Sequence, residues 1–385
     1  MRVLTGVRGF SQGLGALTKG QAGGRRRTVK FGIFYIVQWH ESRTQEQALR
    51  EALEQIELAD QLGIDEVWLG EHHFSRHGLL SGLFSFAGHV AARTKRIRIG
   101  TAVSVLPFHN PIVVAEEAAM LDVLSGGRLN FGVGSGYQRQ EFDGLGVNLD
   151  ESRARFREGL DVIRRAWTEE TLTYHGQFTR VNDLWVIPKP LQKPHPPLYI
   201  AVSTSPASVE YAASNNIQVI VGGPTDIMGQ APQVVKLWRE QMEKYGHPHT
   251  HIDPPVAKGI YVAPTVEEAE TDPIGREDFS LKILAKIGSP VRPDGTAPPG
   301  YETWVNRQND RTRALDPGHA GLPPLRGTPD VVIERLKFVQ EQGINRIFGS
   351  FGFPGLPHEK VLRSIEMFAT QVMPHFRETP VGAAH

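Results

Sequence analysis

The sequence predicts an α/β fold, built as a single closed (β/α)8 TIM barrel. From residue 29 onward, short β-branched or aromatic runs alternate with longer stretches of helical period, and eight such pairs can be counted. The chain has 385 residues, enough for a barrel that uses about 250 or more as one unit. A doubly wound open sheet is the alternative architecture.

Strands and helices follow from the pattern of apolar residues. Between residues 44 and 62, for example, Leu49, Leu53 and Ile56 share one helical face, and Gly63 ends the segment. The expected strands are residues 29–37, 65–70, 96–105, 128–134, 198–202, 218–221, 256–262 and 345–350. The expected helices are residues 44–62, 81–93, 111–124, 206–213, 226–245, 329–342 and 358–372, with one more carrying Phe156, Leu160, Ile163 and Trp167.

Two segments interrupt this rhythm. Residues 171–187 alternate polar and apolar side chains, which predicts a hairpin inserted between two units. Residues 264–325 form a long insertion between strands seven and eight that is rich in Pro and Gly. Because barrel active sites lie at the carboxyl ends of the strands, we expect this insertion to be a mobile lid.

The chain ends are expected to lie outside the barrel. Residues 1–28 carry an Arg triplet at 25–27 and no Asp or Glu, which predicts a disordered basic extension, with a targeting peptide as the alternative. The barrel domain is then expected over residues 29–378 and a short tail over 379–385.

Composition excludes several functions. Lys and Arg together number 42, as do Asp and Glu, so no broad field attracts nucleic acid. The chain has no Cys, which removes disulfides and thiolate chemistry and suits a reducing, cytoplasmic location. No apolar run reaches the ~18 residues of a membrane helix, so we expect no membrane partner.

The candidate chemical centre is the segment Glu71-His72-His73-Phe74, at the end of the second expected strand. This position lies at the mouth of a barrel, where catalytic residues occur. A histidine can take up or donate a proton near neutral pH. Neighbouring strand residues point to opposite sides, so His72 and His73 should face different surroundings. A structural histidine pair is the alternative interpretation.

A metal site is a further alternative, but the spacing of ligands is against it. The first strand ends in Gln38-Trp39-His40 without a His-x-His pair, and no HExxH motif exists. His247, His249 and His251 alternate, but within a polar loop that we expect to be solvated. We therefore predict no metal ion.

Glycines surround the end of the fourth expected strand. Gly132, Gly134 and Gly136 precede Tyr137, and glycines let a flat ligand or a phosphate approach the backbone closely. Tyr137 stands where the dinucleotide pattern G-x-G-x-x-G requires glycine, so this is not a Rossmann fingerprint. Close packing in a tight turn is the alternative reading.

A possible phosphate site follows the fifth expected strand. Ser205 fits a helix N-cap, Pro206 the first helical position and Ser208 the third. Free N–H groups at the helix start, with two hydroxyls beside them, could hold a terminal phosphate. An ordinary capped helix is the alternative.

These motifs, in this order, resemble those of the bacterial luciferase-like flavin-dependent monooxygenases. The likeness spans nearly the whole chain, from FGIFY through DEVWLGEHHF, GTAVSVLP, GGR and RLNFGVGSGY to RGTPDVVIERL and QVMPHF. It implies a barrel that binds reduced FMN (FMNH2), often as a homodimer. It also implies a separate NAD(P)H:flavin reductase as the source of that flavin.

The resemblance also assigns residues. His72 takes the place of the family's catalytic histidine. Ala102 and Val103 match the backbone that lies against the isoalloxazine ring, where family members often hold a non-prolyl cis peptide. The cofactor-binding residues expected in total are Ala102, Val103, Gly134, Ser135, Tyr137, Thr204, Ser205 and Ser208.

The chain departs from the luciferases themselves at three of these positions. The luciferases have a Cys and an Arg where this chain has Gly134 and Ser135, and a Glu at the position of Thr204. Loss of the Arg removes a charge-assisted phosphate contact, and Arg139 is the nearby candidate to replace it. Light emission is not expected.

The resemblance implies that reduced FMN reacts with O2 to give a C4a-(hydro)peroxyflavin, which oxygenates a small, partly apolar organic substrate. His72 would assist as hydrogen-bond partner or proton shuttle. Trp39, Phe108 and Trp304 are candidates for the substrate pocket. A deazaflavin (F420)-dependent dehydrogenase of the same superfamily and a non-catalytic flavin-binding protein remain as alternatives.

Overall fold

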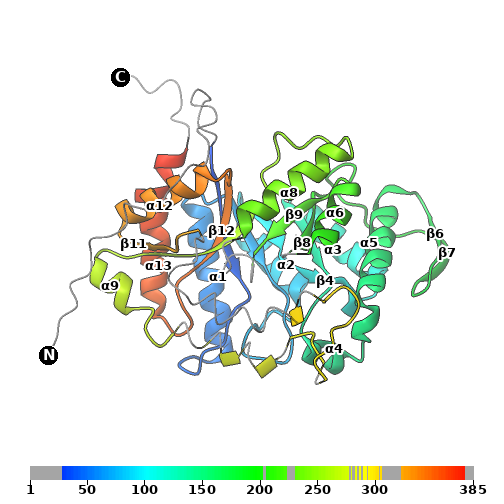
Figure 1. The fold of residues 1–385 in the computed structure, drawn as a ribbon, viewed down its shortest axis with the longest axis horizontal. Coiled ribbons are helices and arrows are strands. Elements are labelled where there is room, and N and C mark those ends of the chain that lie inside the picture. Colours follow the sequence, from blue (N-terminus) through cyan, green and yellow to red (C-terminus); the bar gives the residue numbers. More distant parts are fainter. Residues whose placement is uncertain are drawn as a thin grey trace.

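Eight parallel strands close into a ring, which confirms the (β/α)8 barrel (Figure 1). Each strand pairs with its neighbour in the ring, and β12 pairs with β1 to close it. The ring consists of β1 (Lys30–Tyr35), β2 (Glu66–Leu69), β3 (Arg98–Thr101), β5 (Leu129–Gly134), β8 (Leu198–Val202), β9 (Gln218–Val221), β10 (Val256–Val262) and β12 (Arg346–Phe351). The computed structural model describes residues 28–202, 205–222, 230–276, 279, 282–283, 286–287, 289–292, 294–302, 304–305 and 322–377.

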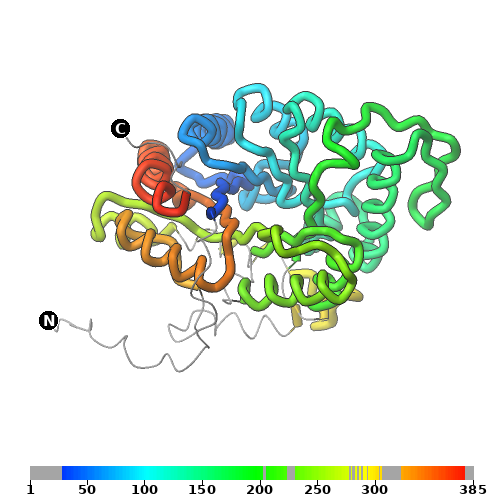
Figure 2. Tube along the Cα trace, turned by 90° about the horizontal axis from the view of Figure 1, so that it is seen from above, coloured from blue at the N-terminus to red at the C-terminus, as the bar shows by residue number. Residues whose placement is uncertain are grey.

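The helices surround the strands, as the view turned by 90° about the horizontal axis shows (Figure 2). Their starts follow local sequence rules: Thr44 and Gln47 form a capping box on α1, and Asn110 caps α3 ahead of Pro111. The main helices are α1 (Gln45–Gln61), α2 (Leu83–Arg93), α3 (Pro111–Leu124), α5 (Ser152–Thr168), α6 (Pro206–Ser214), α8 (Ala231–Lys244), α12 (Pro329–Glu341) and α13 (His358–Met367). Shorter helical segments are α4 (Arg139–Leu145), α9 (Val266–Thr271), η1 (Leu106–Phe108), η2 (Leu149–Glu151), η3 (Phe368–Val372) and η4 (Met373–Phe376).

The expected third strand, residues 96–105, is in fact two strands. β3 ends at Thr101 and β4 (Ser104–Val105) resumes beyond a cis peptide bond between Ala102 and Val103. Both strands pair with β5, so the break redirects the chain without opening the barrel. The continuous strand prediction was therefore wrong at this point, because apolar periodicity does not report a peptide isomer.

A short strand that begins at the last residue of the long insertion was not expected from the sequence. β11 (Leu325–Gly327) pairs in parallel with the second half of β10, beyond the point where β9 pairs with it. The rest of the insertion lies partly outside the described residues, as do residues 226–229 of the expected helix 226–245. The expected N-terminal extension, apart from Thr28, and the expected C-terminal tail also fall outside them.

The expected hairpin is present and projects from one side of the barrel (Figure 1). β6 (Leu172–His175) and β7 (Arg180–Leu184) pair antiparallel. The Glu158 carboxylate on α5 accepts hydrogen bonds from three consecutive N–H groups of the turn, those of Gln177, Phe178 and Thr179. This carboxylate fixes the direction of the hairpin.

The barrel interior holds a small aromatic cluster around a buried ion pair. Trp68 packs against Tyr199 and Phe348, with ring centroids 5.2 and 5.5 Å away. Arg346 donates to both carboxylate oxygens of Glu66 at 2.5 and 3.0 Å, and to the Tyr199 hydroxyl at 3.1 Å. The two buried charges are therefore paired with each other, and Tyr199 adds a further hydrogen bond.

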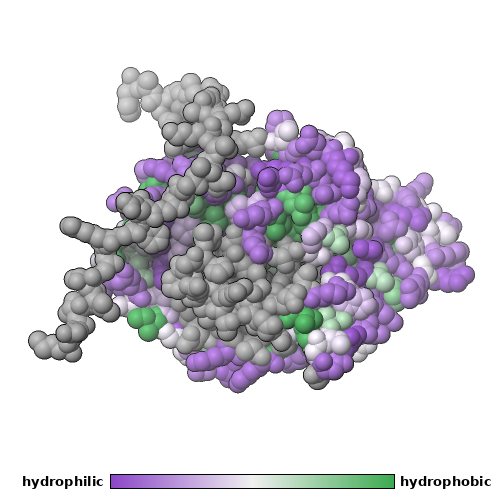
Figure 3. All heavy atoms as spheres, viewed as in Figure 1, coloured by the Kyte–Doolittle hydropathy of each residue, from purple (hydrophilic) through white to green (hydrophobic). Residues whose placement is uncertain are grey.

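The outer surface of the described residues is largely polar on the face shown in Figure 3, where apolar side chains gather only in small patches. Among the helices that the structure describes, none combines the length and apolar content that crossing a bilayer requires.

Barrel closure predicts unequal effects of two Gly→Ala substitutions. A Cβ at Gly132 would lie 2.0 Å from the Thr101 carbonyl oxygen in the neighbouring strand, whereas a Cβ at Gly259 meets nothing within 4 Å. We expect Gly132→Ala to lower the free energy of unfolding by about 3 kcal/mol or more. Gly259→Ala should change it by less than about 1 kcal/mol. Urea unfolding of both variants measures this, and equal effects would contradict it.

Candidate active site

Glu71 anchors the end of β2 inside the protein. Its carboxylate accepts hydrogen bonds from His73 Nε2 at 2.8 Å, His109 Nε2 at 2.7 Å and the Val105 N–H at 2.8 Å. Burial opposes ionisation of Glu71, but these donors outweigh it, and the pKa of the carboxyl lies below its ordinary value. Burial likewise opposes the charged form of His109, and the Glu71 contact outweighs it and raises the pKa of that imidazole.

His72 and His73 lie beyond the end of β2, and their rings have different partners. His72 Nδ1 lies 2.9 Å from Glu141 Oε1, and the same oxygen accepts the His73 backbone N–H at 2.9 Å. Glu141 is buried at the start of α4, and the Gln138 amide lies 3.2 Å from the same ring nitrogen. A carboxylate oxygen accepts a hydrogen bond from Nδ1 in the tautomer that has the ring proton there. Nε2 forms no hydrogen bond to any residue that the structure describes.

A second histidine, which the sequence did not single out, lies against His72. The ring centroids of His77 and His72 are 4.6 Å apart. Burial and the neighbouring His72 lower the pKa of His77 to about 3, so this imidazole is neutral near neutral pH. The loop that returns to His72 depends on Gly78, where a Cβ would lie 2.9 Å from the Cβ of His72.

The cis peptide between Ala102 and Val103 lies beside this segment. The Val103 carbonyl oxygen accepts the Glu71 N–H at 3.2 Å, and the Ala102 N–H donates to the Leu69 carbonyl at 2.6 Å. A Cβ at Gly134 would lie 2.6 Å from Val103 Cγ2, so glycine at the end of β5 leaves the space that Val103 fills. The cis peptide that the family resemblance implied is thus present, and its backbone connects the EHH segment to the glycines of β5.

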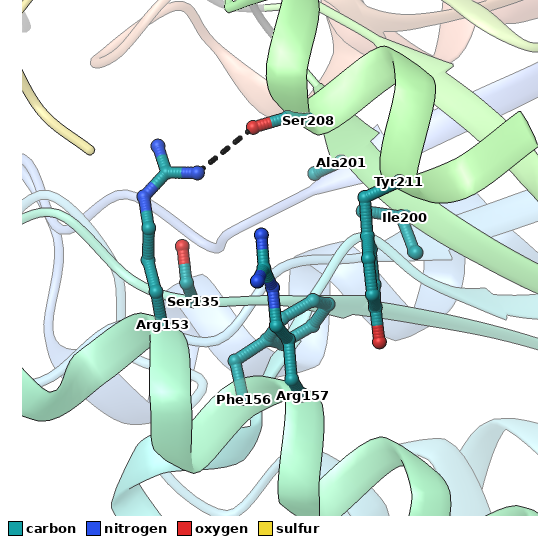
Figure 4. A pocket seen from close by; sticks show the side chains of 8 residues that line it. All are labelled: Ser135, Arg153, Phe156, Arg157, Ile200, Ala201, Ser208 and Tyr211. Atoms are coloured by element: carbon teal, nitrogen blue, oxygen red, sulfur yellow. Dashed lines mark hydrogen bonds between the residues drawn. The ribbon is translucent and has the colours of Figure 1, made fainter. Parts of the chain in front are cut away.

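A small cavity of about 30 Å³ lies between α5, α6 and the ends of β5 and β8 (Figure 4). Arg153 Nη1 donates to Ser208 Oγ at 3.1 Å, and the Arg157 guanidinium lies 4.8 Å from the centre of the Tyr211 ring. Two guanidinium groups beside hydroxyls suit an anion such as a phosphate. The lining residues are Ser135, Arg153, Phe156, Arg157, Ile200, Ala201, Ser208 and Tyr211.

The structure places the expected phosphate residues unequally. Ser135 and Ser208 line this cavity, and Ser205 is the N-cap of α6 but makes no capping hydrogen bond with its side chain. Thr204 lies outside the described residues. Arg139, the basic residue considered from the sequence, instead donates to the Pro290 carbonyl at 2.8 Å.

Arg153 and Arg157 were not predicted from the sequence, because they lie on α5, before the strand that the expected phosphate site follows. Their spacing of four residues on one helix, in SRARFREG, places both on one face and was the available signal.

A described part of the insertion, which includes Tyr301 and Trp304, packs against the loop after β5. The Tyr301 hydroxyl donates to the Gly136 carbonyl at 2.6 Å and lies 3.3 Å from Ser135 Oγ. Trp304 stacks on Tyr137 with ring centroids 5.1 Å apart, and Arg153 also donates to the Gly300 carbonyl. The insertion therefore contacts Ser135 and Arg153, two of the residues that line the cavity.

The other expected pocket residues lie apart from one another. Phe108 packs on Phe142 and on His73, with ring centroids 4.7 and 5.8 Å away, whereas Trp39 lies under the Arg76 guanidinium. No group of three or more potential metal ligands comes together within the described residues.

The neutral state of His77 predicts how stability depends on pH. Between the ordinary histidine pKa of 6.5 and about 3, the unfolded chain binds a proton here that the folded chain does not. This histidine therefore makes folding less favourable as pH falls through that window, by about 1.4 kcal/mol per pH unit near pH 5. His77→Phe should flatten the pH dependence of the unfolding free energy by that amount. Urea unfolding at pH 4.5, 5.5 and 7.5 measures the slope, and identical slopes would contradict a neutral His77.

Several known proteins are similar to this chain in sequence. Limonene 1,2-monooxygenase of Rhodococcus erythropolis is 29% identical over 361 residues, covering 90% of this chain and 87% of that protein. The oxygenase component of the flavin-dependent trigonelline monooxygenase of Acinetobacter baylyi is 27% identical, covering 93% and 98%. An uncharacterized Sinorhizobium fredii protein is 40% identical over 157 residues, but the match spans only 45% of that protein.

Solved structures show the same fold. The monooxygenase RslO1 of Streptomyces bottropensis superposes with a TM-score of 0.77 at 29% identity, over 90% of this chain and all of that one. A coenzyme F420-dependent tetrahydromethanopterin reductase of Methanopyrus kandleri shares the fold at 18% identity, with a TM-score of 0.64, over 91% of this chain and all of that one.

The family model that describes luciferase-like monooxygenases matches residues 29–346. The chain belongs to the luciferase-like monooxygenase family of flavin-dependent enzymes.

Proposed function

We propose that the protein is an FMN-dependent monooxygenase that receives reduced FMN from a separate reductase and uses O2 to oxygenate a small, partly apolar organic substrate. The cavity between α5 and α6 is the observation that carries the flavin part of this proposal, and the family supplies the monooxygenase part. The cavity offers two guanidinium groups and two hydroxyls to one anion, and FMN ends in a phosphate.

The residues present fit FMN at both ends. Arg153, Arg157, Ser135 and Ser208 would hold the phosphate, with Ser205 and the N–H groups at the start of α6 beside them. A flat ring system would lie toward the cis peptide between Ala102 and Val103. Tyr137 would close this side together with Trp304, on which it stacks.

Reduced FMN, when bound, supplies the electrons that activate O2 for transfer of one oxygen atom to the substrate. The chain's own contribution is a proton site. Glu141 holds the proton on His72 Nδ1, so Nε2 is the atom that accepts or donates a hydrogen bond or a proton at the reacting centre.

The insertion would exclude water from this site. Its docking through Tyr301 and Trp304 covers part of the loop after β5, and Tyr301 is almost fully buried. Exclusion of water protects reactive intermediates from hydrolysis.

A separate reductase is part of the proposal for two reasons. The sequence has no G-x-G-x-x-G unit for a nicotinamide cofactor, and the trigonelline relative is an oxygenase component. A deazaflavin-dependent dehydrogenase is the second candidate, because an F420-dependent enzyme shares the fold.

One experiment separates these two functions. Purified protein is supplied with reduced FMN and O2, or with reduced F420 without O2, and with a panel of terpenes, ketones and aldehydes. Products heavier by one oxygen atom with FMN support the monooxygenase. Hydride transfer from F420, with no oxygenated product from FMN, would refute it.

The phosphate assignment predicts a selective loss of affinity. Hydrogen bonds to charged groups contribute about 1.5–3 kcal/mol, so Arg153→Met should weaken FMN binding by roughly 10- to 100-fold. Binding of riboflavin, which has no phosphate, should change little. Flavin fluorescence titration measures both.

A control variant is available on the same helix. Arg155 pairs with Glu151 away from the cavity, and Arg155→Met should leave both affinities unchanged. Equal losses for FMN and riboflavin in Arg153→Met would point to a general distortion instead.

The role of His72 predicts uncoupling. His72→Ala should lower the yield of oxygenated product per reduced FMN by roughly 10²-fold or more, the lower range for a proton-transfer group, while FMN binding stays largely intact. Product and hydrogen peroxide are quantified together by mass spectrometry and a peroxidase assay. An unchanged yield of product per reduced FMN in this variant would contradict the role of His72.

We also propose that the protein forms a homodimer through α3. The exposed residues of this helix are Val113, Met120, Val123 and Leu124, with Glu117 as the sole charged one. Leu124 is 72% exposed, and it lies beside the other exposed apolar side chains of this helix. Sedimentation should therefore give twice the monomer mass, and Leu124→Glu should reduce it. Phe338→Glu, on the exposed face of α12, is the control that should leave the mass unchanged.

A further inference from the structure

The loop after the EHH segment folds back over His72. Phe74 has a φ of 55°, and Ser75 forms a bridge with Gly78. The Arg76 carbonyl accepts the Trp39 N–H at 3.0 Å, and the Leu79 N–H donates to the Ile36 carbonyl at 3.1 Å. Both hydrogen bonds fasten the loop to the chain that follows β1, so its position does not depend on His72.

This loop places the His77 ring against the face of the His72 ring. The two rings approach to 4.6 Å between centroids at an angle of 60°. His77 is only 8% exposed, and the Gln38 amide lies 3.4 Å from its Nδ1. The contact is therefore between two side chains held from separate directions.

We propose that His77 is a positioning residue for His72, because its ring packs on the His72 ring and keeps Nδ1 on Glu141 and Nε2 toward the reacting molecule. The proposal rests on the function proposed above, in which His72 acts at the reacting centre. It adds a residue that takes no part in binding FMN.

The surroundings of His72 explain why a packing partner is needed. Glu141 and Gln138, both from the α4 side, contact the Nδ1 edge of the ring, and no described residue bonds to Nε2. A ring held at one edge can still turn about its Cβ–Cγ bond. A displacement of about 1 Å at a reacting centre can cost ~10²-fold in rate.

The residue that packs on the face of the His72 ring must also add no charge there. His77 is buried, and burial together with His72 lowers its pKa to about 3. The groups that face the His72 ring are thus one buried carboxylate, one amide and one neutral imidazole. His77 supplies ring surface without a second positive charge.

The experiment compares two substitutions that separate ring packing from imidazole chemistry. His77→Ala removes the ring, whereas His77→Phe keeps a ring of similar size without nitrogen atoms. His375→Ala removes an exposed histidine on η4 and serves as the control. Circular dichroism and urea unfolding establish that each variant is folded.

The first readout is nitrogen-15 NMR of the histidine rings in flavin-free protein. Wild type, His77→Phe and the control should show a single His72 tautomer with the proton on Nδ1. His77→Ala should show a mixture of both tautomers. An unchanged His72 tautomer in His77→Ala would overturn the proposal.

The second readout is product formed per reduced FMN, with a substrate that the wild type oxygenates. His77→Ala should lose roughly 10-fold in yield and kcat with little change in KM, and His77→Phe should recover most of the loss. Equal losses in both variants would overturn the packing role. The NMR result does not depend on turnover, so failure of the proposed function would leave the positioning of His72 tested by itself.

Discussion

Two buried carboxylates fix the end of β2, and the arrangement of the site depends on them. An unpaired buried carboxylate would be costly, so each must find donors. Glu71 forms hydrogen bonds with the His73 and His109 rings and with the Val105 N–H. Glu141 forms hydrogen bonds with the His72 ring and the His73 N–H. Because one carboxylate lies on each side of the strand end, the adjacent imidazoles are drawn apart. His73 becomes part of the interior, whereas His72 keeps one ring nitrogen that bonds to no described residue.

Much of the barrel could be predicted because its elements are regular. Helix α3 begins at Pro111 and ends at Leu124, as expected, since proline and a following Ser-Gly-Gly mark both ends in the sequence. The strand β11 could not be found in this way. Its three residues include an Arg and a Gly, and it is a strand only because the edge of β10 is open beyond β9.

Local motifs predicted part of the candidate site. His72 was predicted from EHHF and its place at a strand end, and Ser205 and Ser208 were predicted from the start of α6. Glu141 and His77 were not predicted. Each acts through a contact that forms only when the chain folds, across 69 residues for Glu141 and around a tight turn for His77. Single-sequence patterns carry no information on such contacts.

Neither end of the proposed cofactor site decides between oxygenase and dehydrogenase. An anion cavity with Arg153, Arg157 and serine hydroxyls suits any flavin or deazaflavin that carries a phosphate, so it cannot distinguish oxygenase from dehydrogenase. At the other end, His72 Nε2 forms no hydrogen bond to any described residue, and the His72 ring lies against His77. Protection of an oxygen-derived species would require a proton held in one place and water kept out. Hydride transfer from an alcohol also requires a proton acceptor held in place, and exclusion of water serves both reactions. The arrangement around His72 therefore fits either reaction, and the identity of the flavin that the chain uses decides between them.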